Sequence, residues 1–192
     1  MRVSFPEVAR LTIQRLETIG TIADARSAPQ HATFEELVAL HAPRLRRLAH
    51  RLLGWRDFAG AEDVVQDVFL AAFEKLDSFR GDAKVVTWLT TITLNRCRTH
   101  RRRRLLKLRW LARRDEPASD GRAMQDETSA RVREAVQNLS PRDREVIVLF
   151  HLEEQPVAEI AKLLGAKANT IEVRLHRARQ RLKQQLGDLM ID

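Results

Sequence analysis

Apolar residues recur every three or four positions along most of the chain from residue 33 onward. The first run opens with Thr33 and Glu36 in a T-x-x-E capping box, and Gly54 follows its last apolar residue. Two further runs cover about residues 61–76 and 84–104. Because this spacing is typical of a helix that buries one face, the pattern predicts three amphipathic helices. The apolar positions of the second helix are Ala61, Val64, Val65, Val68, Ala72 and Leu76.

Four shorter helices are predicted in the C-terminal part of the chain. The first covers about residues 130–138, and the second begins at Ser140-Pro141, where an N-cap residue precedes proline at the first helical position. The third begins at Pro156, and the fourth covers about residues 168–186. The sequence therefore predicts a second group of packed helices after the first three.

The last two of these helices have the pattern of a helix-turn-helix. Ala161 supplies the small residue that a steep helix crossing needs, Gly165 tolerates a positive φ at the turn, and Ile171 supplies an apolar plug. The final helix also carries a basic stripe, as a helix that enters the major groove requires. A helical hairpin with a solvated arginine face is the alternative, and the Ala-Gly-Ile spacing favours DNA binding. The residues of this stripe are Arg174, Arg177 and Arg181.

Two segments do not share the helical pattern. Residues 1–33 form an N-terminal extension whose role the sequence does not indicate, and residues 105–129 are a largely polar stretch that is long for a loop inside one domain. We therefore expect an all-α protein of two small helical domains joined by a flexible linker. The predicted domains are residues 34–104 and residues 130–192, and the second contains the helix-turn-helix.

Composition excludes several classes of protein. Glycine (7), proline (6) and aromatic residues (5%) are too few for a sandwich or barrel of short strands. Cys97 is the only cysteine, which excludes an intramolecular disulfide framework. We expect Cys97 to be a semi-buried structural residue, and a redox-sensing role is the minor alternative. No apolar run is long enough to span a membrane, and no secretory signal is evident, so the expected location is the cytoplasm.

No motif of the sequence indicates an enzyme. There is no glycine-rich phosphate loop, no H-E-x-x-H zinc motif and no nucleophile elbow, and the six histidines lack ligand spacing. We expect no catalytic residue, no metal and no cofactor.

Charge indicates nucleic acid as a partner. The net charge is +8, and the stretch from Arg96 to Arg114 holds ten lysine or arginine residues and no acidic residue. Such a block releases counterions from a polyanion when it binds. A solvated linker or a helix end favoured by the helix dipole is the alternative, but four consecutive arginines at 101–104 exceed what a dipole needs. We therefore expect contact with nucleic acid.

The second predicted helix carries an acidic face, which is unusual on a basic chain. An ordinary solvated face is one interpretation, and a docking surface for a protein partner with Leu70 as its apolar anchor is the other. Periodicity alone slightly favours the solvated face. The residues of this face are Asp63, Gln66, Asp67, Leu70 and Glu74.

Several stretches resemble bacterial RNA polymerase sigma factors, and their order resembles the small extracytoplasmic-function (ECF) group of that family. Residues 61–70 (AEDVVQDVFL) are similar to the polymerase-binding helix, and residues 79–81, 87–89, 92 and 95 with the arginine run are similar to the promoter-melting segment. Residues 139–146 and 174–179 resemble the C-terminal DNA-binding region. The resemblance covers about residues 34–104 and 130–186, and it implies a transcription initiation factor that binds core RNA polymerase and a two-part promoter.

The resemblance also implies a role for particular residues. It assigns the acidic face to polymerase binding, against the solvated alternative. It assigns the loop and the third helix to the minus-ten element, where a flipped base is held, although the apolar stripe around Trp88 favours a core position for that residue. The minus-ten residues are Phe79, Arg80, Lys84, Trp88, Asn95, Arg96, Arg101 and Arg102. The minus-thirty-five residues are Lys167, Thr170, Glu172, Arg174, Arg177 and Arg181.

Some positions depart from the family pattern. Thr99 stands where an aspartate is usual, and Pro156 and Lys167 stand where serines usually cap the two helices of the motif. Glu172 stands where a basic residue is common in the family. We expect this difference to affect which promoter sequence is recognised and to leave the fold unchanged. An anti-sigma factor is a further candidate partner that the family implies. The alternative function is a stand-alone helix-turn-helix regulator, which would need neither the acidic face nor the segment from Phe79 to Arg104.

Overall fold

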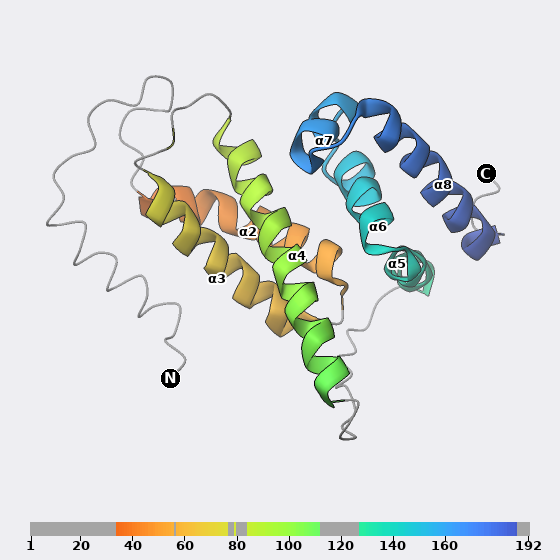
Figure 1. Ribbon diagram of the computed structural model, residues 1–192, viewed down its shortest axis with the longest axis horizontal. Coiled ribbons are helices and arrows are strands. Elements are labelled where there is room, and N and C mark those ends of the chain that lie inside the picture. The colour runs from red at the N-terminus through yellow and green to blue at the C-terminus, as the bar shows by residue number, and fades with distance from the viewer. Residues whose placement is uncertain (1–33, 56, 77–78, 80–83, 112–126, 188–192) are drawn as a thin grey trace, which may run out of the picture.

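The computed structural model describes residues 34–55, 57–76, 79, 84–111 and 127–187, and these residues are helical apart from short turns (Figure 1). No strand occurs among them, so the all-helical fold class is confirmed. An N-terminal unit contains α2 (Phe34–Leu53), α3 (Phe58–Lys75) and α4 (Val85–Leu111). A C-terminal unit contains α5 (Glu127–Asn138), α6 (Pro141–Ile147), the π-helical segment η2 (Val148–Leu152), α7 (Val157–Leu164) and α8 (Ala168–Leu186). The predicted extension over residues 1–33, with Thr33 of the capping box, lies outside the described residues.

The three helices of the N-terminal unit pack around the apolar stripes that the sequence predicts. Val64, Val65 and Val68 of α3 are at most 2% exposed, and Leu48 and Leu52 of α2 are fully buried. Gly54 ends α2 with a φ of 104°, a conformation that side chains other than glycine rarely adopt. α3 begins three residues earlier than predicted, because the carboxylate of Asp57 caps it by accepting from the backbone N–H of Gly60.

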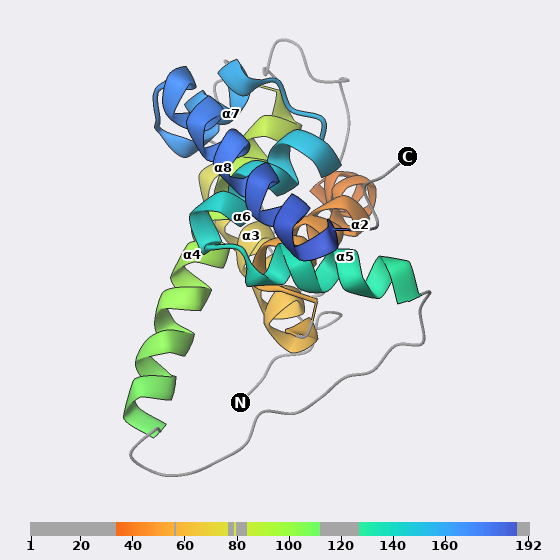
Figure 2. The same ribbon diagram turned by 90° about the vertical axis from the view of Figure 1, so that its right-hand side faces the viewer.

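α4 is longer than its apolar stripe. Residues 105–111, which we expected in the linker, continue the helix, because the arginine and leucine residues there have high helix propensity and no glycine or proline interrupts them. The C-terminal turns of α4 project beyond the other helices (Figure 2). Leu105 and Leu106 are accordingly 61% and 57% exposed. Residues 127–129 of the predicted linker belong to α5, and its residues 112–126 lie outside the described residues.

In the C-terminal unit, α7 and α8 form the predicted helix-turn-helix. Gly165 adopts the left-handed conformation at the end of α7, with a φ of 61°, and Ile160 and Ile171 are fully buried. Ser140 caps α6 by accepting from the N–H of Asp143, as its position before Pro141 predicts. The π-helical segment η2 was not predicted, because a single wide turn does not change the apolar pattern.

Glu154 follows η2 and has a φ of 52°. This left-handed conformation is unfavourable for every residue that carries a Cβ atom. We expect Glu154→Gly to raise the free energy of unfolding by about 0.5–1 kcal/mol, measured by denaturant titration. Gly165→Ala is the reciprocal control, because its added Cβ would meet nothing within 4 Å and any loss would come from the backbone alone. A destabilised Glu154→Gly protein would show that the Glu154 side chain matters more than its backbone.

Cys97 is buried more deeply than we expected, with 1% of its surface exposed in the core of the N-terminal unit. Burial raises the pKa of its thiol to about 12. The reactive thiolate is therefore scarce at neutral pH, which argues against the redox alternative.

Cys97 is expected to react with a thiol reagent at about pH 8 roughly 1,000-fold more slowly in the native protein than in the unfolded chain, because so little of it is ionised. A time course with a chromogenic disulfide, with and without denaturant, measures this ratio. Equal rates in the two conditions would contradict the burial of Cys97.

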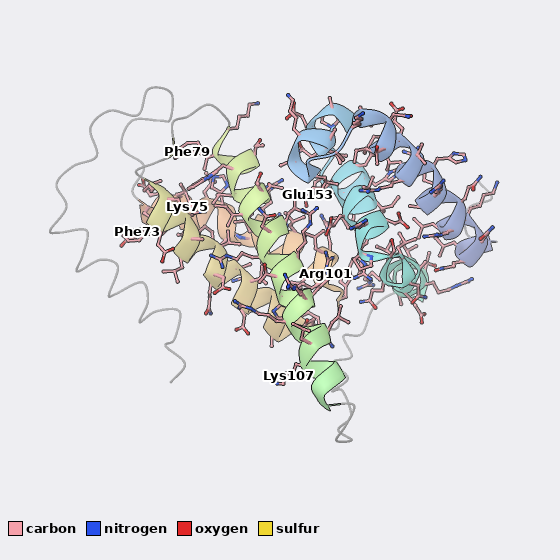
Figure 3. All side chains as sticks on the ribbon, viewed as in Figure 1. Phe73, Lys75, Phe79, Arg101, Lys107 and Glu153 are labelled. Atoms are coloured by element: carbon pink, nitrogen blue, oxygen red, sulfur yellow. The ribbon has the colours of Figure 1, made fainter. Side chains whose placement is uncertain are left out.

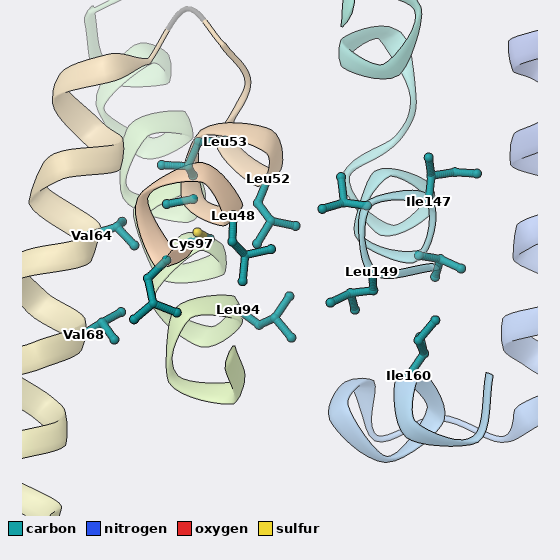
Figure 4. Packing of buried hydrophobic residues seen from close by; sticks show 14 of the residues in the cluster. Leu48, Leu52, Leu53, Val64, Val68, Leu94, Cys97, Ile147, Leu149 and Ile160 are labelled. Atoms are coloured by element: carbon teal, nitrogen blue, oxygen red, sulfur yellow. The ribbon is translucent and has the colours of Figure 1, made fainter. Parts of the chain in front are cut away.

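The two units pack against each other. Figure 4 shows buried side chains of the N-terminal unit, among them Leu52 and Leu94, facing Ile147 and Leu149 of the C-terminal unit. One apolar cluster includes residues from both units. The polar contacts along this boundary join residues that are 44 to 109 positions apart in the sequence, from Arg101 with Glu145 to Arg44 with Glu153.

Candidate nucleic-acid and protein interfaces

The acidic face lies on the side of α3 that points away from the core. Leu70 is 51% exposed, whereas the neighbouring Phe69 is 5% exposed. Asp63, Gln66 and Glu74 are exposed and Asp67 is half-buried. The structure thus brings all five predicted residues to one outer face, with an apolar side chain at its centre. An exposed leucine between carboxylates suits a protein partner better than a nucleic acid.

One side of α4 carries a stripe of polar and aromatic residues. Lys84 and Trp88 are four positions apart, and Asn95 and Arg102 follow at intervals of seven, so all four share one face of the helix. The Phe79 ring lies on the Trp88 ring, with centroids 4.8 Å apart and planes inclined by 33°. Figure 3 labels Phe79, which precedes α4. Trp88 is half-buried and packs against the core, as its place in the apolar stripe predicts, and the rest of its surface remains accessible. Arg80 lies outside the described residues.

Arg96 and Arg101 do not lie on that stripe. Arg96 is half-buried. The guanidinium of Arg101 is directed toward the C-terminal unit, where its Nη2 donates to the carboxylate of Glu145 on α6. Its Nη1 donates to the carbonyl of Leu52 at the end of α2, with a donor–acceptor distance of 3.4 Å. Arg101, predicted from the sequence to face DNA, is therefore engaged inside the molecule in this structure.

The exposed side of α8 carries the predicted recognition residues. Thr170 and Arg177 are exposed, Arg174 is half-buried, and the three share one face at intervals of four and three. Lys167 precedes the helix without a side-chain cap, as its lack of an acceptor predicts. Glu172 is also exposed, beside this face.

Arg181 forms an ion pair inside the C-terminal unit. Its Nη1 lies 2.5 Å from Oδ2 of Asp143 on α6, and Asp143 is 9% exposed. This ion pair fixes the C-terminal half of α8 to α6. Arg181, predicted from the sequence to face DNA, is therefore paired with a carboxylate of its own unit in this structure.

A cluster of side chains around Asp57 was not predicted from the sequence. The Asp57 carboxylate lies 3.1 Å from Nε2 of His100 and 3.0 Å from Nη1 of Arg104, besides capping α3. Gly60 allows this approach, because a Cβ there would lie 2.5 Å from both Asp57 and His100. The position of an aspartate shortly before a predicted helix could have indicated the cap. The partners of Asp57 on α4 are distant in the sequence, so no local pattern indicates them.

The described part of the chain contains no group of three or more histidine, cysteine or acidic residues that could hold a metal ion. No helix in that part is long and apolar enough to cross a membrane. The surfaces that remain for function are the acidic face of α3, the stripe on α4 and the recognition face of α8.

Comparison with known proteins decides the family. The Sigma-70 region 2 family matches residues 37–105, and the Sigma-70 region 4 family matches residues 129–182. The ECF RNA polymerase sigma factor SigM of Mycobacterium tuberculosis is 34% identical over 167 residues, which cover 86% of this chain and 83% of SigM. The chain belongs to the ECF family of RNA polymerase sigma factors.

Two other relatives extend this result. SigW of Bacillus subtilis, also an ECF sigma factor, is 29% identical over 170 residues, covering 81% of this chain and 90% of SigW. The sigma factor RpoE of Bartonella quintana, solved in complex with the anti-sigma factor NepR, matches with a TM-score of 0.66 at 29% identity, covering 80% of this chain and 96% of RpoE.

The family defines the general activity of this sigma factor. It acts in transcription initiation, binds RNA polymerase and DNA, and recognises the promoter through regions 2 and 4. The N-terminal unit is region 2 and the C-terminal unit contains region 4. Sigma factors are not enzymes, which confirms the expectation from the missing catalytic motifs.

Proposed function

We propose that three separate faces divide the work of this sigma factor. The acidic face of α3 binds core polymerase, the stripe on α4 with Phe79 holds the minus-ten element, and the N-terminal half of α8 reads the minus-thirty-five element. The observation that carries this proposal is the opposite charge of the two helix faces in region 2. Acidic residues gather with Leu70 on α3, while Lys84 and Arg102 lie on α4.

The α4 stripe suits an unpaired base next to a phosphate chain. Phe79 and Trp88 offer an aromatic surface on which a flipped base can stack, and stacking contributes about 1–3 kcal/mol per base. Asn95 is exposed two turns further along and has the donor and acceptor that a base edge requires. Lys84 and Arg102, at the two ends of the stripe, attract the phosphates, and Arg80 and Arg96 are predicted to contribute from its sides.

The α8 face suits a duplex. Thr170, Arg174 and Arg177 form the part of the helix that would enter the major groove, with Lys167 at its N-terminal end. Glu172 is placed to accept from a cytosine amino group, which would tie the promoter sequence to this residue. We leave Arg181 out of this set, because its guanidinium is paired with Asp143.

The proposed site of action is the cytoplasm, where polymerase and promoter DNA meet. An anti-sigma factor is a proposed further partner, and the complex of the related RpoE with NepR supports it.

Reconstitution tests the proposed function. The purified chain is mixed with bacterial core polymerase, and co-elution and run-off transcription on fragmented genomic DNA are measured. Co-elution with discrete new transcripts is the expected result, and alignment of their start sites gives the promoter. Duplex binding without co-elution would instead favour the stand-alone regulator.

Arg174→Ala is expected to weaken binding of the full chain to duplexes carrying the minus-thirty-five sequence by about 1–3 kcal/mol, because a lost base contact has that cost. Titration of a fluorescent duplex by anisotropy measures the change. Gln184→Ala, also exposed on α8 but near its far end, is the matched control and should bind as the parent does. Unchanged binding by Arg174→Ala would remove this residue from the recognition face.

A further inference from the structure

The basic run of α4 has a side on which its arginines are paired with carboxylates. Arg98 and Arg101 donate to the carboxylate of Glu145 on α6, and Arg104 pairs with Asp57 before α3. These three arginines follow one another at intervals of three, so they lie along one side of a helix with 3.6 residues per turn. Figure 3 labels Arg101, whose guanidinium is directed toward the C-terminal unit. The charge on this side of α4 is therefore already neutralised inside the molecule.

The other side of the same run carries arginines that are free. Arg102 and Arg103 are exposed and Arg96 is half-buried. None of their three guanidiniums forms a hydrogen bond or an ion pair with any residue that the structure describes. Thr99 is exposed between them, three residues after Arg96 and three and four residues before the other two. Residues at these intervals are neighbours on a helix surface, so Thr99 is next to all three arginines.

The hydroxyl of Thr99 differs from those of three other threonines on α4. Thr90, Thr91 and Thr93 each donate to the backbone carbonyl four residues earlier, at 2.7 to 2.9 Å. The hydroxyl of Thr99 makes no such bond and has no partner among the residues that the structure describes. Because this side chain is exposed, its hydroxyl is available to donate to a ligand.

Three cations around one hydroxyl suit an anion that offers several oxygens. A guanidinium binds phosphate oxygens through charge-assisted hydrogen bonds, and threonine hydroxyls are among the usual donors to the phosphates of nucleic acids. Asn95 and Arg102, both on the proposed minus-ten stripe, lie one helical turn before and after Thr99. A strand whose base edge reaches Asn95 would therefore carry its backbone over Thr99.

The residue type at position 99 decides the charge of this surface. An aspartate, which is usual at this position in the family, would accept from the arginines three and four residues further along. It would also repel a phosphate. Threonine supplies a donor without a negative charge, so the guanidiniums remain for the ligand.

We propose that Arg96, Thr99, Arg102 and Arg103 form a seat for one backbone phosphate of the strand that α4 binds, and we call these four residues the phosphate seat. The guanidiniums neutralise the phosphate, and the hydroxyl of Thr99 donates to one of its oxygens. Because a backbone phosphate carries no sequence information, the phosphate seat fixes the position of the strand and does not select its bases. The inference rests on the proposed minus-ten role of α4, to which it adds Thr99 and Arg103.

Two substitutions of Thr99 test the phosphate seat. The full chain is titrated into a fluorescent single strand of arbitrary sequence, and anisotropy gives the affinity. Thr99→Val keeps the shape of the side chain and removes the donor, so binding is expected to weaken about fivefold. Thr99→Asp is expected to weaken binding about 30-fold, because its carboxylate occupies the guanidiniums and repels the phosphate.

Thr128 provides the matched control for both substitutions. It is exposed on α5, outside the phosphate seat, and Thr128→Val and Thr128→Asp make the same changes of shape and net charge. Both control variants should bind the strand as the parent does. All four variants change exposed side chains, so each should keep the helical circular dichroism of the parent.

Salt dependence gives a second and independent measurement. For a single strand, the logarithm of the binding constant falls with the logarithm of the salt concentration, with a slope of about −0.7 for each phosphate that is neutralised. Arg103→Gln is expected to make this slope shallower by about 0.7. Thr99→Val should keep the parental slope, because it removes no charge. Arg131→Gln, at an exposed arginine of α5, is the control and should keep it as well.

Two results would overturn the proposal. One is parental affinity of Thr99→Val, or equal affinities of Thr99→Asp and Thr128→Asp, since Thr99 would then contact no phosphate. The other is an equal salt slope for Arg103→Gln and Arg131→Gln. These titrations contain neither polymerase nor promoter. A chain that passes them and gives no transcript in the reconstitution would therefore contradict the proposed function and leave the phosphate seat in place.

Discussion

Asp67→Lys combined with Leu70→Ala is expected to weaken binding of core RNA polymerase by about 100-fold or more. Leu70 is 51% exposed at the centre of the acidic face, and truncation of a hot-spot residue at an interface costs about 2 kcal/mol or more. Reversal of the charge at Asp67 adds repulsion against a basic partner surface. Co-elution and a competition titration with labelled core polymerase measure the loss.

The control for this double variant is the same chemical change on another outer face of region 2. Glu35→Lys with Leu40→Ala serves, because Leu40 on α2 is 74% exposed and Glu35 is exposed on the same helix. Both double variants should keep the helical circular dichroism of the parent, since neither touches the core. Parental polymerase affinity in the Asp67 and Leu70 variant would remove the acidic face of α3 from the proposed interface.

Ile171→Ala is expected to lower the free energy of unfolding of region 4 by about 2–5 kcal/mol, the usual cost of emptying a fully buried isoleucine site. Ile171 is 0% exposed and packs in the cluster with Ile160 and Leu175. A loss of this size is a large part of the stability of a small domain, so binding to the minus-thirty-five duplex should fall as well. Thermal unfolding followed by circular dichroism measures the effect.

Val173→Ala is the matched control for Ile171→Ala, because it truncates a β-branched residue two positions away that is 41% exposed. We expect its unfolding free energy to change by no more than about 0.5 kcal/mol. If the Val173→Ala and Ile171→Ala proteins unfolded at the same temperature, the predicted inner face of α8 would be wrong.

Local signals predicted the helix-turn-helix in detail. The turn needs a residue that tolerates a positive φ, which is Gly165, and the close helix crossing needs a small residue, which is Ala161. Ile171 fills the apolar space between the two helices. Each requirement depends only on residues that are close in the sequence. The acidic face of α3 could be predicted for the same reason, since one helical period determines which side is buried. The start of α3 and the end of α4 were less predictable. Asp57 caps α3 three residues before its first predicted position, and α4 continues beyond the end of its apolar stripe.

The ion pairs between the two units, such as those of Arg98 and Arg101 with Glu145, could not be predicted from the sequence. Arg98 and Glu145 are 47 residues apart, and periodicity carries no information on which distant helices meet. Arg101 was assigned to DNA because it belongs to a basic run, yet a carboxylate from the other region neutralises it in this structure. Arg181 likewise pairs with Asp143, a contact that its place in the basic stripe of α8 does not indicate. In both cases the charge of the residue was evident and its partner was not.

The burial of Cys97 has a consequence for site-specific labelling of this protein. Cys97 is the only cysteine of the sequence, its surface is 1% exposed, and burial raises the pKa of its thiol. A thiol-reactive dye therefore modifies a cysteine introduced on the surface of the native protein in preference to Cys97. Fluorescent probes can be attached to either unit without first replacing the native cysteine.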